Sequence, residues 1–372
     1  MNLPLLENQK NLAGKKVLLR LDLNVPIKDD KVVDDFRIRK ILPTLELLHY
    51  AGARTIILSH LEGKGGDSLR PVWQELIKKF TVSFSADLSE LAKNAGDLED
   101  GNFTLLENLR VNVGEKANDE NFAKKLASFG EIFVNEAFAV SHRAHASIVG
   151  LPKLLPSFAG PLFAEEVREL SGALKPDRPA LFILGGAKFE TKLPLLKKFI
   201  SLYDLVFVGG ALANDFFKAQ GFNIGSSLVS KTSLNLASLV ESNLHLPNDA
   251  IVRNAVAIST KALDKISQGE KIVDAGPNTV EILRKLVSRV QFILWNGPLG
   301  EYEAGFDNGT KNLATLIAQS QAKSVVGGGD TVTAITALGL EDKFSFVSTG
   351  GGAMLDFLAN ETLPGLQSLL IH

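Results

Sequence analysis

The stretch Ala180-Leu-Phe-Ile-Leu-Gly-Gly186 is an apolar run that ends in two glycines, and Leu205-Val-Phe-Val-Gly-Gly210 has the same pattern. Between them, residues 193–202 carry apolar side chains at helical spacing. A short apolar run bounded by glycines is typical of a strand buried on both faces, and such strands alternate with helices in parallel sheets. This segment therefore predicts a strand, a helix and a second strand of an α/β fold.

The same alternation continues over the rest of the 372 residues. Segments with helical spacing, such as residues 37–50 and 119–129, lie between most of the apolar runs. Further runs that indicate buried strands occupy residues 16–21, 55–58, 103–106, 132–134, 292–295 and 324–326. The sequence therefore predicts an α/β fold with two doubly wound, Rossmann-like parallel sheets joined by a helical hinge.

The length of the chain suffices for two domains, each with a core of its own. Three prolines between residues 152 and 161 precede a helical pattern that ends at Lys175-Pro176, where proline stops a helix. The final segment is too short to form a unit, so we expect it to pack back towards the N-terminal domain. The expected boundaries are an N-terminal domain at 1–161, a hinge helix at 162–175, a C-terminal domain at 176–357 and a returning segment at 358–372.

Composition excludes several classes of function. Forty Lys and Arg stand against 42 Asp and Glu, and a net charge of -2 gives no electrostatic reason to bind nucleic acid or an anionic membrane. The chain has no cysteine, which excludes disulfides and thiolate catalysis and fits a reducing compartment. Residues 1–16 lack a secretory pattern, and no run approaches the roughly 20 apolar residues of a membrane span. We expect a cytoplasmic monomer without nucleic-acid or membrane partners.

The two halves differ in the residues that follow their strands. Ligands of open α/β sheets bind at the carboxyl ends of strands, so this difference predicts two different ligands. The N-terminal strands are followed by polar side chains: Arg20, Asp22, Asn24, Ser59, His60, Asn108, Arg110, Asn135 and Glu136. The C-terminal strands are followed by glycines at residues 185–186, 209–210, 297, 327–329 and 350–352.

Glycines between a strand and a helix let backbone N–H groups approach an anion, and the helix N-terminus adds about half a positive charge. Tight turns also need glycine, but five clusters in one half favour a phosphate-rich ligand. Neither a P-loop nor a dinucleotide GxGxxG fingerprint is present. Lys188 and Lys192 share one face at a helix start, either as a solvated pair or around an anion. Asp330 suits a helix N-cap, a magnesium ligand or both.

Several segments in order resemble one known family, phosphoglycerate kinase, over essentially the whole chain. In the N-terminal half these are Arg20-Leu-Asp-Leu-Asn-Val-Pro26, Asp35-Phe-Arg-Ile-Arg39 with Leu42-Pro-Thr44, Leu105-Leu-Glu-Asn-Leu-Arg110, Phe133-Val-Asn-Glu-Ala-Phe138 and Ser141-His-Arg-Ala-His-Ala-Ser147. In the C-terminal half they are Leu184-Gly-Gly-Ala-Lys188, Trp295-Asn-Gly-Pro-Leu-Gly300, Gly327-Gly-Gly-Asp-Thr331 and Ser348-Thr-Gly-Gly-Gly352.

The resemblance implies a reversible, magnesium-dependent phosphoryl transfer between 1,3-bisphosphoglycerate and ADP, giving 3-phosphoglycerate and ATP. It implies that phosphoglycerate is bound by Arg20, Asp22, Asn24, Arg37, His60, Lys64, Arg110 and Arg143. It implies that the nucleotide is bound by Lys192, Gly210, Asn296, Pro298, Glu303, Gly328, Gly329, Asp330 and Thr331, with Glu303 at the ribose and Asp330 nearest the Mg²⁺. The residues implied in catalysis are Arg37, Lys188, Gly328 and Gly351.

This implied chemistry agrees with what the residue types can do. Phosphoryl transfer has a loose transition state, so it needs positioning and cationic stabilisation more than a base or a nucleophile. Arginine binds carboxylate or phosphate in a bidentate manner, whereas lysine acts as a movable point charge. A basic half and a glycine-rich half must then meet, which favours hinge closure that also excludes water.

The chain departs from the family pattern after its second predicted strand. The family usually reads Ser-His-Leu-Gly-Arg-Pro, and here the run is Ser59-His-Leu-Glu-Gly-Lys64. Either Glu62 is an insertion that moves Lys64 into the role of the arginine, or the cation is lost and a carboxylate lies beside the substrate. Arg70 is a further candidate for the missing cation.

The expected nucleobase pocket departs as well. Ala211 and Ile272 stand where the family commonly has glycine. Their side chains would reshape the pocket, so the base preference stays open. Two other functions are weighed against the kinase: a catalytically weakened relative that only binds its ligands, and a nicotinamide dehydrogenase, which the missing fingerprint disfavours.

Overall fold

We describe the protein from a computed structural model over residues 2–62, 68–187, 189–230, 236, 239 and 243–370. The side chains of residues 190 and 191 are not described. The predictions made for Lys64 and Lys188 lie outside these residues. No helix in the described part of the chain has the length and apolar composition needed to cross a membrane.

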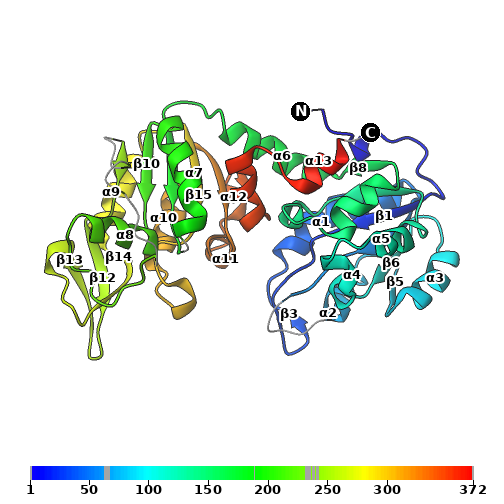
Figure 1. The fold of residues 1–372 in the computed structure, drawn as a ribbon, viewed down its shortest axis with the longest axis horizontal. Coiled ribbons are helices and arrows are strands. Elements are labelled where there is room, and N and C mark those ends of the chain that lie inside the picture. Colours follow the sequence, from blue (N-terminus) through cyan, green and yellow to red (C-terminus); the bar gives the residue numbers. More distant parts are fainter. Residues whose placement is uncertain are drawn as a thin grey trace. The chain divides into compact units, whose positions relative to one another are not determined.

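The chain divides into two compact units (Figure 1). Unit 1 comprises Met1–Arg168 together with Asn360–His372, and unit 2 comprises Glu169–Ala359. The chain passes between them twice, first within helix α6 (Pro161–Ala173) and again between Ala359 and Asn360.

Unit 1 is built on a six-stranded parallel sheet in the order β5-β6-β4-β1-β7-β8. The strands are β1 (Lys16–Arg20), β4 (Arg54–Leu58), β5 (Val82–Ser85), β6 (Phe103–Leu106), β7 (Ile132–Asn135) and β8 (Ser157–Ala159). A small antiparallel pair, β2 (Ile27–Lys28) and β3 (Lys31–Val32), lies outside the sheet. The helices are α1 (Phe36–Tyr50), α2 (Arg70–Leu76), α3 (Leu88–Gly96), α4 (Val113–Lys116), α5 (Glu120–Ala127) and α13 (Pro364–Leu369).

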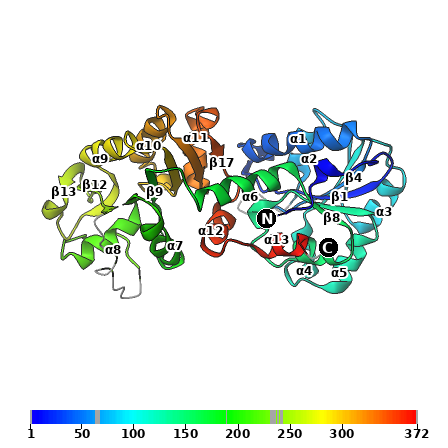
Figure 2. The ribbon, with the colours of Figure 1, turned by 90° about the horizontal axis from the view of Figure 1, so that it is seen from above.

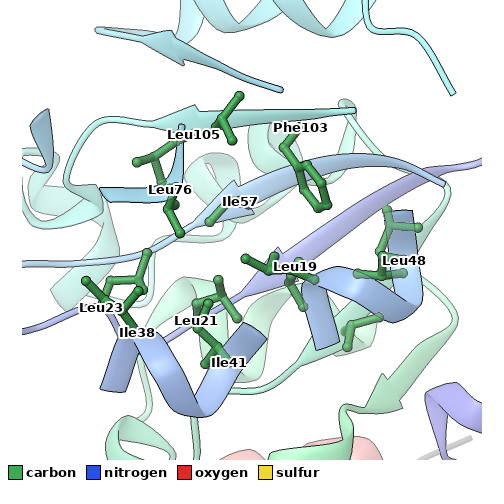
Figure 3. Packing of buried hydrophobic residues seen from close by; sticks show 14 of the residues in the cluster. Leu19, Leu21, Leu23, Ile38, Ile41, Leu48, Ile57, Leu76, Phe103 and Leu105 are labelled. Carbon is green, nitrogen blue, oxygen red and sulfur yellow. The ribbon is translucent and has the colours of Figure 1, made fainter. Parts of the chain in front are cut away.

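Both faces of this sheet are buried. Alternate residues of a strand point to opposite faces, and Val17 and Leu19 of β1 belong to one core cluster whereas Leu18 belongs to another. Figure 3 shows the first cluster, in which Leu19 lies with Ile57 of β4 and Ile41 of α1. A continuous apolar run such as residues 16–21 is therefore what this sheet requires.

The C-terminal segment belongs to unit 1, where Figure 2 shows α13 among the other elements of that unit. The backbone N–H of Gly365 donates to the carbonyl of Ser141 at 2.8 Å, and the hydroxyl of Ser368 donates to the carbonyl of Ile148 at 3.2 Å. A Cβ on Gly365 would come within 2.6 Å of the Ser141 Oγ, so this contact requires glycine.

Unit 2 also contains a six-stranded parallel sheet, in the order β11-β10-β9-β15-β16-β17, and a three-stranded antiparallel sheet, β13-β12-β14. The parallel strands are β9 (Ala180–Leu184), β10 (Leu205–Val208), β11 (Leu244–His245), β15 (Phe292–Asn296), β16 (Lys323–Gly327) and β17 (Phe346–Val347). The antiparallel strands are β12 (Asp249–Arg253), β13 (Ile258–Ala262) and β14 (Lys271–Ala275). The helices are α7 (Phe189–Leu202), α8 (Ala211–Ala219), α9 (Pro277–Val287), α10 (Asn308–Ala318), α11 (Gly329–Ala337) and α12 (Gly351–Asn360), with α9 packed against α10 (Figure 2).

The fold predicted from the sequence is confirmed. Each apolar run named above coincides with a strand of one of the two parallel sheets, and the helical segments coincide with α1, α5 and α7. The antiparallel sheet was not predicted, because β13 is largely exposed and its polar residues give no buried-strand pattern. The edge strands β8, β11 and β17 were missed because each has only two or three residues.

A buried carboxyl group fixes the start of α6. The Glu136 side chain, which follows β7, accepts hydrogen bonds from the backbone N–H groups of Leu162 at 3.0 Å and Phe163 at 2.9 Å, and from the Thr44 hydroxyl. A Cβ on Gly160 would come within 2.1 Å of the Glu136 Oε2, so only glycine leaves room for this carboxyl group. Burial raises the pKa of Glu136 to about 7, against the opposing effect of its three donors.

We predict that Glu136 makes unit 1 less stable as the pH rises. A carboxyl group whose pKa is raised from 4.5 to about 7 on folding binds more protons in the folded than in the unfolded chain between these values. The free energy of unfolding should therefore fall by up to ~3 kcal/mol across that interval. Glu136→Gln lacks this titration, so the stability advantage of the unmodified chain over the variant should shrink from pH 4.5 to 7 in urea unfolding. A difference that stays constant with pH contradicts this prediction.

Candidate functional site

The polar side chains predicted for the N-terminal half lie at the carboxyl edge of the unit 1 sheet. Asp22 and Asn24 follow β1, His60 follows β4, and Arg110 follows β6. These strands are parallel and β4 lies between β1 and β6, so their carboxyl ends meet at one edge. The predicted residues are thus brought together.

Asp22 connects the two flanks of this cluster. Its carboxylate lies 3.2 Å from Nη1 of Arg37 and 4.0 Å from Nδ1 of His60. Arg37, on the first turn of α1, also donates from Nη1 to the carbonyl of Asn24 at 2.6 Å. These two contacts with the loop after β1 hold the guanidinium of Arg37 next to the cluster.

His60 lies among the arginines. Burial lowers its pKa well below the usual value, and the charges of Arg20, Arg110, Arg37 and Arg143 lower it further. The imidazole is therefore neutral at pH 7. It can donate one hydrogen bond to a ligand without adding charge, while the arginines supply the positive potential for an anion.

Arg20 differs from the other arginines because its side chain is fully buried. Its Nε donates to the Ser147 hydroxyl at 2.8 Å, and its Nη2 lies 3.9 Å from the Glu115 carboxylate and 3.3 Å from Nδ1 of His60. These contacts favour a role in positioning His60. The role in substrate binding that the resemblance implies for Arg20 stays a prediction.

The loop after β4 places a carboxylate in the basic cluster. Glu62 forms an ion pair with Arg110 and lies 3.5 Å from Nζ of Lys116 and 3.7 Å from Nη1 of Arg143. A carboxylate in the basic cluster is a feature of the second alternative for this loop, and both alternatives stay predictions. The replacement of the family arginine by Lys64 lies outside the described residues.

Arg70 has a different partner. Its guanidinium carbon lies 4.5 Å from the ring centroid of Phe84, on the outermost strand β5. A cation stacked on an aromatic face at this distance is stabilised by the contact itself. This contact gives Arg70 a packing role, and its role as the missing cation stays a prediction.

The glycine clusters of unit 2 serve two different purposes. Gly210, with φ 61°, and Gly297, with φ 96°, adopt left-handed conformations, and a Cβ on either would lie within 2.7 Å of backbone atoms. These glycines allow the loops after β9, β10 and β15 to pack against one another. By contrast, a Cβ on Gly329 or Gly351 would meet no atom of the described residues within 4 Å.

Gly329 and Gly351 begin α11 and α12, which follow the neighbouring strands β16 and β17. Protein packing does not explain the choice of glycine at these two helix starts. A backbone that must lie close to a ligand does explain it, and a helix N-terminus favours an anion. Gly328, with φ 110°, directly precedes the first of these helices.

A cavity of about 350 Å³ lies beside these loops within unit 2. This volume is in the range of small-molecule binding pockets. Ala211 and Ile272 both line it, as expected for the residues proposed to reshape the base pocket. Of the predicted nucleotide-binding residues, the cavity lining includes Gly210, Pro298, Glu303 and Asp330.

The other predicted nucleotide-binding residues lie beside the cavity rather than in its wall. Nζ of Lys192 donates to the carbonyl of Gly185 at 2.6 Å. The Thr331 hydroxyl accepts from the backbone N–H of Gly297 at 3.1 Å, and Asn296 is buried next to it at the end of β15. Thr331 and Asn296 thus stabilise the loops that form the site.

The surroundings of the Asp330 carboxyl group favour a bound cation. Burial raises the pKa of its carboxyl, the negative charge of Glu303 raises it further, and Lys192 opposes both. The described residues contain no group of three His, Cys, Asp or Glu side chains that could hold a metal by themselves. This donor set fits Mg²⁺, which typically uses one or two carboxylates and takes other ligands from phosphate and water.

Sequence reasoning missed several residues of both sites. In unit 1 these are Glu115, which is buried against Arg20 and Ser147, and Lys116. Their position six or fewer residues after Arg110 is the signal that could have indicated them. In unit 2 the missed cavity residues include Asn214, Lys271 and Glu301, which carry no pattern of their own.

The chain matches the family model described as phosphoglycerate kinase over residues 7–361. It is 42% identical over 392 aligned positions to the phosphoglycerate kinase of Leptospira biflexa, covering 100% of this chain and 99% of that one. The phosphoglycerate kinase structure from Coxiella burnetii matches with 39% identity and a TM-score of 0.83, and that from Pyrococcus horikoshii with 30% and 0.86. Each covers 99% of this chain and 98% of its own.

We predict that Gly210→Ala destabilises unit 2 more than Gly221→Ala does. Both residues have positive φ, 61° and 84°, so each substitution incurs a backbone cost of ~1–3 kcal/mol, and residue 210, with ψ -156°, lies in a region essentially restricted to glycine. The Cβ at residue 210 would also approach the Gly186 nitrogen to 2.6 Å, whereas at residue 221 it would meet nothing within 4 Å. The clash should add about 1–3 kcal/mol. Thermal unfolding of the two variants measures the difference, and equal losses contradict the packing role of Gly210.

Proposed function

Because this chain belongs to the phosphoglycerate kinase family, we propose that its two sites divide the substrates, with phosphoglycerate bound by unit 1 and the nucleotide by unit 2. The chain is an ATP:3-phospho-D-glycerate 1-phosphotransferase of glycolysis. It transfers a phosphoryl group reversibly between 1,3-bisphosphoglycerate and ADP, giving 3-phosphoglycerate and ATP. The observation that supports this division is a contrast between the two sheets. Arginine side chains gather where the strands of the unit 1 sheet end, whereas uncrowded glycines begin the helices that follow strands of the unit 2 sheet.

On the phosphoglycerate side, we assign the anionic groups of the substrate to the arginine cluster. Arg110 and Arg143 supply charge, and Arg37 is held by Asp22 and the carbonyl of Asn24 in a fixed orientation. A guanidinium that is already oriented loses less entropy when it binds a carboxylate or phosphate. His60 is neutral and offers a directional hydrogen bond to the substrate.

On the nucleotide side, we assign the phosphates to the N-termini of α11 and α12 and the base and ribose to the cavity of unit 2. Glu303 lies in the cavity wall, where its carboxylate can accept from ribose hydroxyls. We assign Asp330 to Mg²⁺, which would take its other ligands from phosphate oxygens and water. The bound Mg²⁺ would neutralise phosphate charge, which is the chemistry that it commonly supplies in phosphoryl transfer.

The transfer itself requires stabilisation of charge on the moving phosphoryl group. We assign this role to Arg37 and Lys188 and to the backbone N–H groups at Gly328 and Gly351, with Lys192 and Gly329 beside them. The two ligands must meet, so residues 162–175 are proposed as a hinge between an N-terminal domain (1–161) and a C-terminal domain (176–357). We further propose that the chain is cytoplasmic, in line with the absence of cysteine, and that it acts as a monomer.

We predict that the purified chain turns over 3-phosphoglycerate and Mg-ATP in a coupled assay, and that EDTA abolishes the activity. Lys188→Ala should lower kcat by about two to three orders of magnitude with a smaller change in KM, because transition-state electrostatics typically contribute several kcal/mol. Lys197→Ala, an exposed change that also removes one lysine charge, is the control and should behave as the unmodified chain. If the folded chain shows no turnover in either direction, the kinase function is contradicted and the alternative of a protein that only binds its ligands is favoured.

A second prediction separates ligand approach from packing at Gly351. In the part of the chain that the structure describes, a Cβ there meets no atom within 4 Å, so Gly351→Ala should fold with unchanged or slightly higher stability. The methyl group would stand where the phosphoryl group must approach the backbone, so kcat should fall by at least about tenfold. Gly96→Ala in α3, also without a neighbour within 4 Å, is the control and should keep full activity. Full activity of the Gly351 variant contradicts the assigned role.

A further inference from the structure

The Glu62 carboxylate lies where the proposed substrate would bring its own anion. It is paired with Arg110, and Arg143 and Lys116 lie within 3.7 Å. The Arg110 side chain is only 5% exposed, whereas that of Glu62 is 49% exposed. One partner is therefore fixed in the protein and the other can turn into water.

The backbone at Glu62 is held by other members of the cluster. Its N–H donates to Oδ1 of Asn24 at 2.9 Å, and the carbonyl of the preceding Leu61 accepts from Nδ2 of Asn108 at 2.9 Å. Asn24 follows β1 and Asn108 follows β6, so the loop after β4 is tied on both sides. The proximity of the carboxylate to the arginines is therefore built into the sheet edge.

The carboxylate is ionised at neutral pH. Burial acts to raise the pKa of Glu62, but the charges of Arg110, Lys116 and Arg143 and a hydrogen bond from Lys116 bring it below the usual value. The basic cluster thus contains an anion of its own. A ligand anion must either accept repulsion from this carboxylate or displace it from Arg110.

We propose that Glu62 competes with the anionic group of phosphoglycerate for Arg110 and Arg143 and thereby sets the affinity of the site. This inference rests on the proposed function, which places the substrate at these arginines. On binding, the half-exposed carboxylate moves off Arg110 and stays near the half-exposed Lys116. Because the ligand must displace a singly charged carboxylate, the site favours a ligand group with more negative charge. A phosphate dianion is such a group, and a guanidinium binds it with two hydrogen bonds.

An alternative role makes the opposite prediction. If Glu62 instead held Arg110 and Arg143 in the orientation that the substrate needs, its removal would loosen the arginines and weaken binding. Under competition, removal of the negative charge strengthens binding. The sign of the change in affinity therefore separates the two roles.

The test compares Glu62→Gln with Glu131→Gln by calorimetric titration of 3-phosphoglycerate in the absence of nucleotide. Glu131 is an exposed carboxylate at the opposite edge of the sheet, where it accepts from the backbone N–H of Lys16 at the start of β1, and its change removes the same charge. For Glu62→Gln we expect the Kd to fall by about fivefold, the size of a partly exposed ion pair. The KM for 3-phosphoglycerate should fall with it while kcat changes less. Inorganic sulfate, a simpler dianion, should become a stronger competitive inhibitor.

Arg110→Ala separates this inference from the proposed function. If Arg110→Ala weakens 3-phosphoglycerate binding but Glu62→Gln leaves the Kd unchanged or raises it, the competition is wrong and the substrate assignment stands. If Arg110→Ala leaves the Kd unchanged, the substrate assignment itself is wrong and the inference falls with it. In the Arg110→Ala background, Glu62→Gln should lose most of its effect, because the two residues act on each other. An undiminished effect there contradicts competition for Arg110.

Discussion

The parallel pairing of β1 with β4 and β7, like that of β9 with β10 and β15, brings the carboxyl ends of neighbouring strands to one edge of each sheet. In unit 1 both faces of the sheet are covered by apolar clusters, so polar side chains find room where the strands end. Loops from strands far apart in the sequence then meet at that edge. The chemistry of each unit follows from which residues stand there.

Much of this arrangement could be predicted from the sequence because it has a local cause. A strand that is buried on both faces must be continuously apolar, and β1, β6 and β15 show such runs. The function of a glycine could not be predicted in the same way. Gly210 is required by a neighbouring backbone, whereas among the described residues a Cβ on Gly351 meets no atom within 4 Å, yet both simply follow a strand in the sequence. That distinction depends on what surrounds each residue in space.

The carboxylates of unit 1 make the same point for charge. Glu136 is buried, and its pKa is raised to about 7 even though three groups donate to it. Glu62 lies among Arg110, Lys116 and Arg143, and its pKa is lowered. From the sequence, Glu136 matches a family motif and Glu62 departs from one, but the sequence does not tell whether the pKa of either residue is raised or lowered. The sign depends on whether desolvation or neighbouring charge dominates, which only the fold determines.

In the proposed arrangement, the two units bind anions with different groups. A substitution changes one kind of group more readily than the other. Unit 1 uses side chains, so one carboxylate such as Glu62 can offset part of its positive potential. Unit 2 uses backbone N–H groups at helix starts, which no substitution other than proline removes. Around the phosphates in unit 2, a substitution can therefore change the site only by adding a larger side chain. The proposed base pocket of unit 2 is instead lined by side chains such as those of Ala211 and Ile272. The places where this chain departs from the family pattern, Glu62, Ala211 and Ile272, are thus those where side chains rather than backbone contact the ligands in the proposed arrangement.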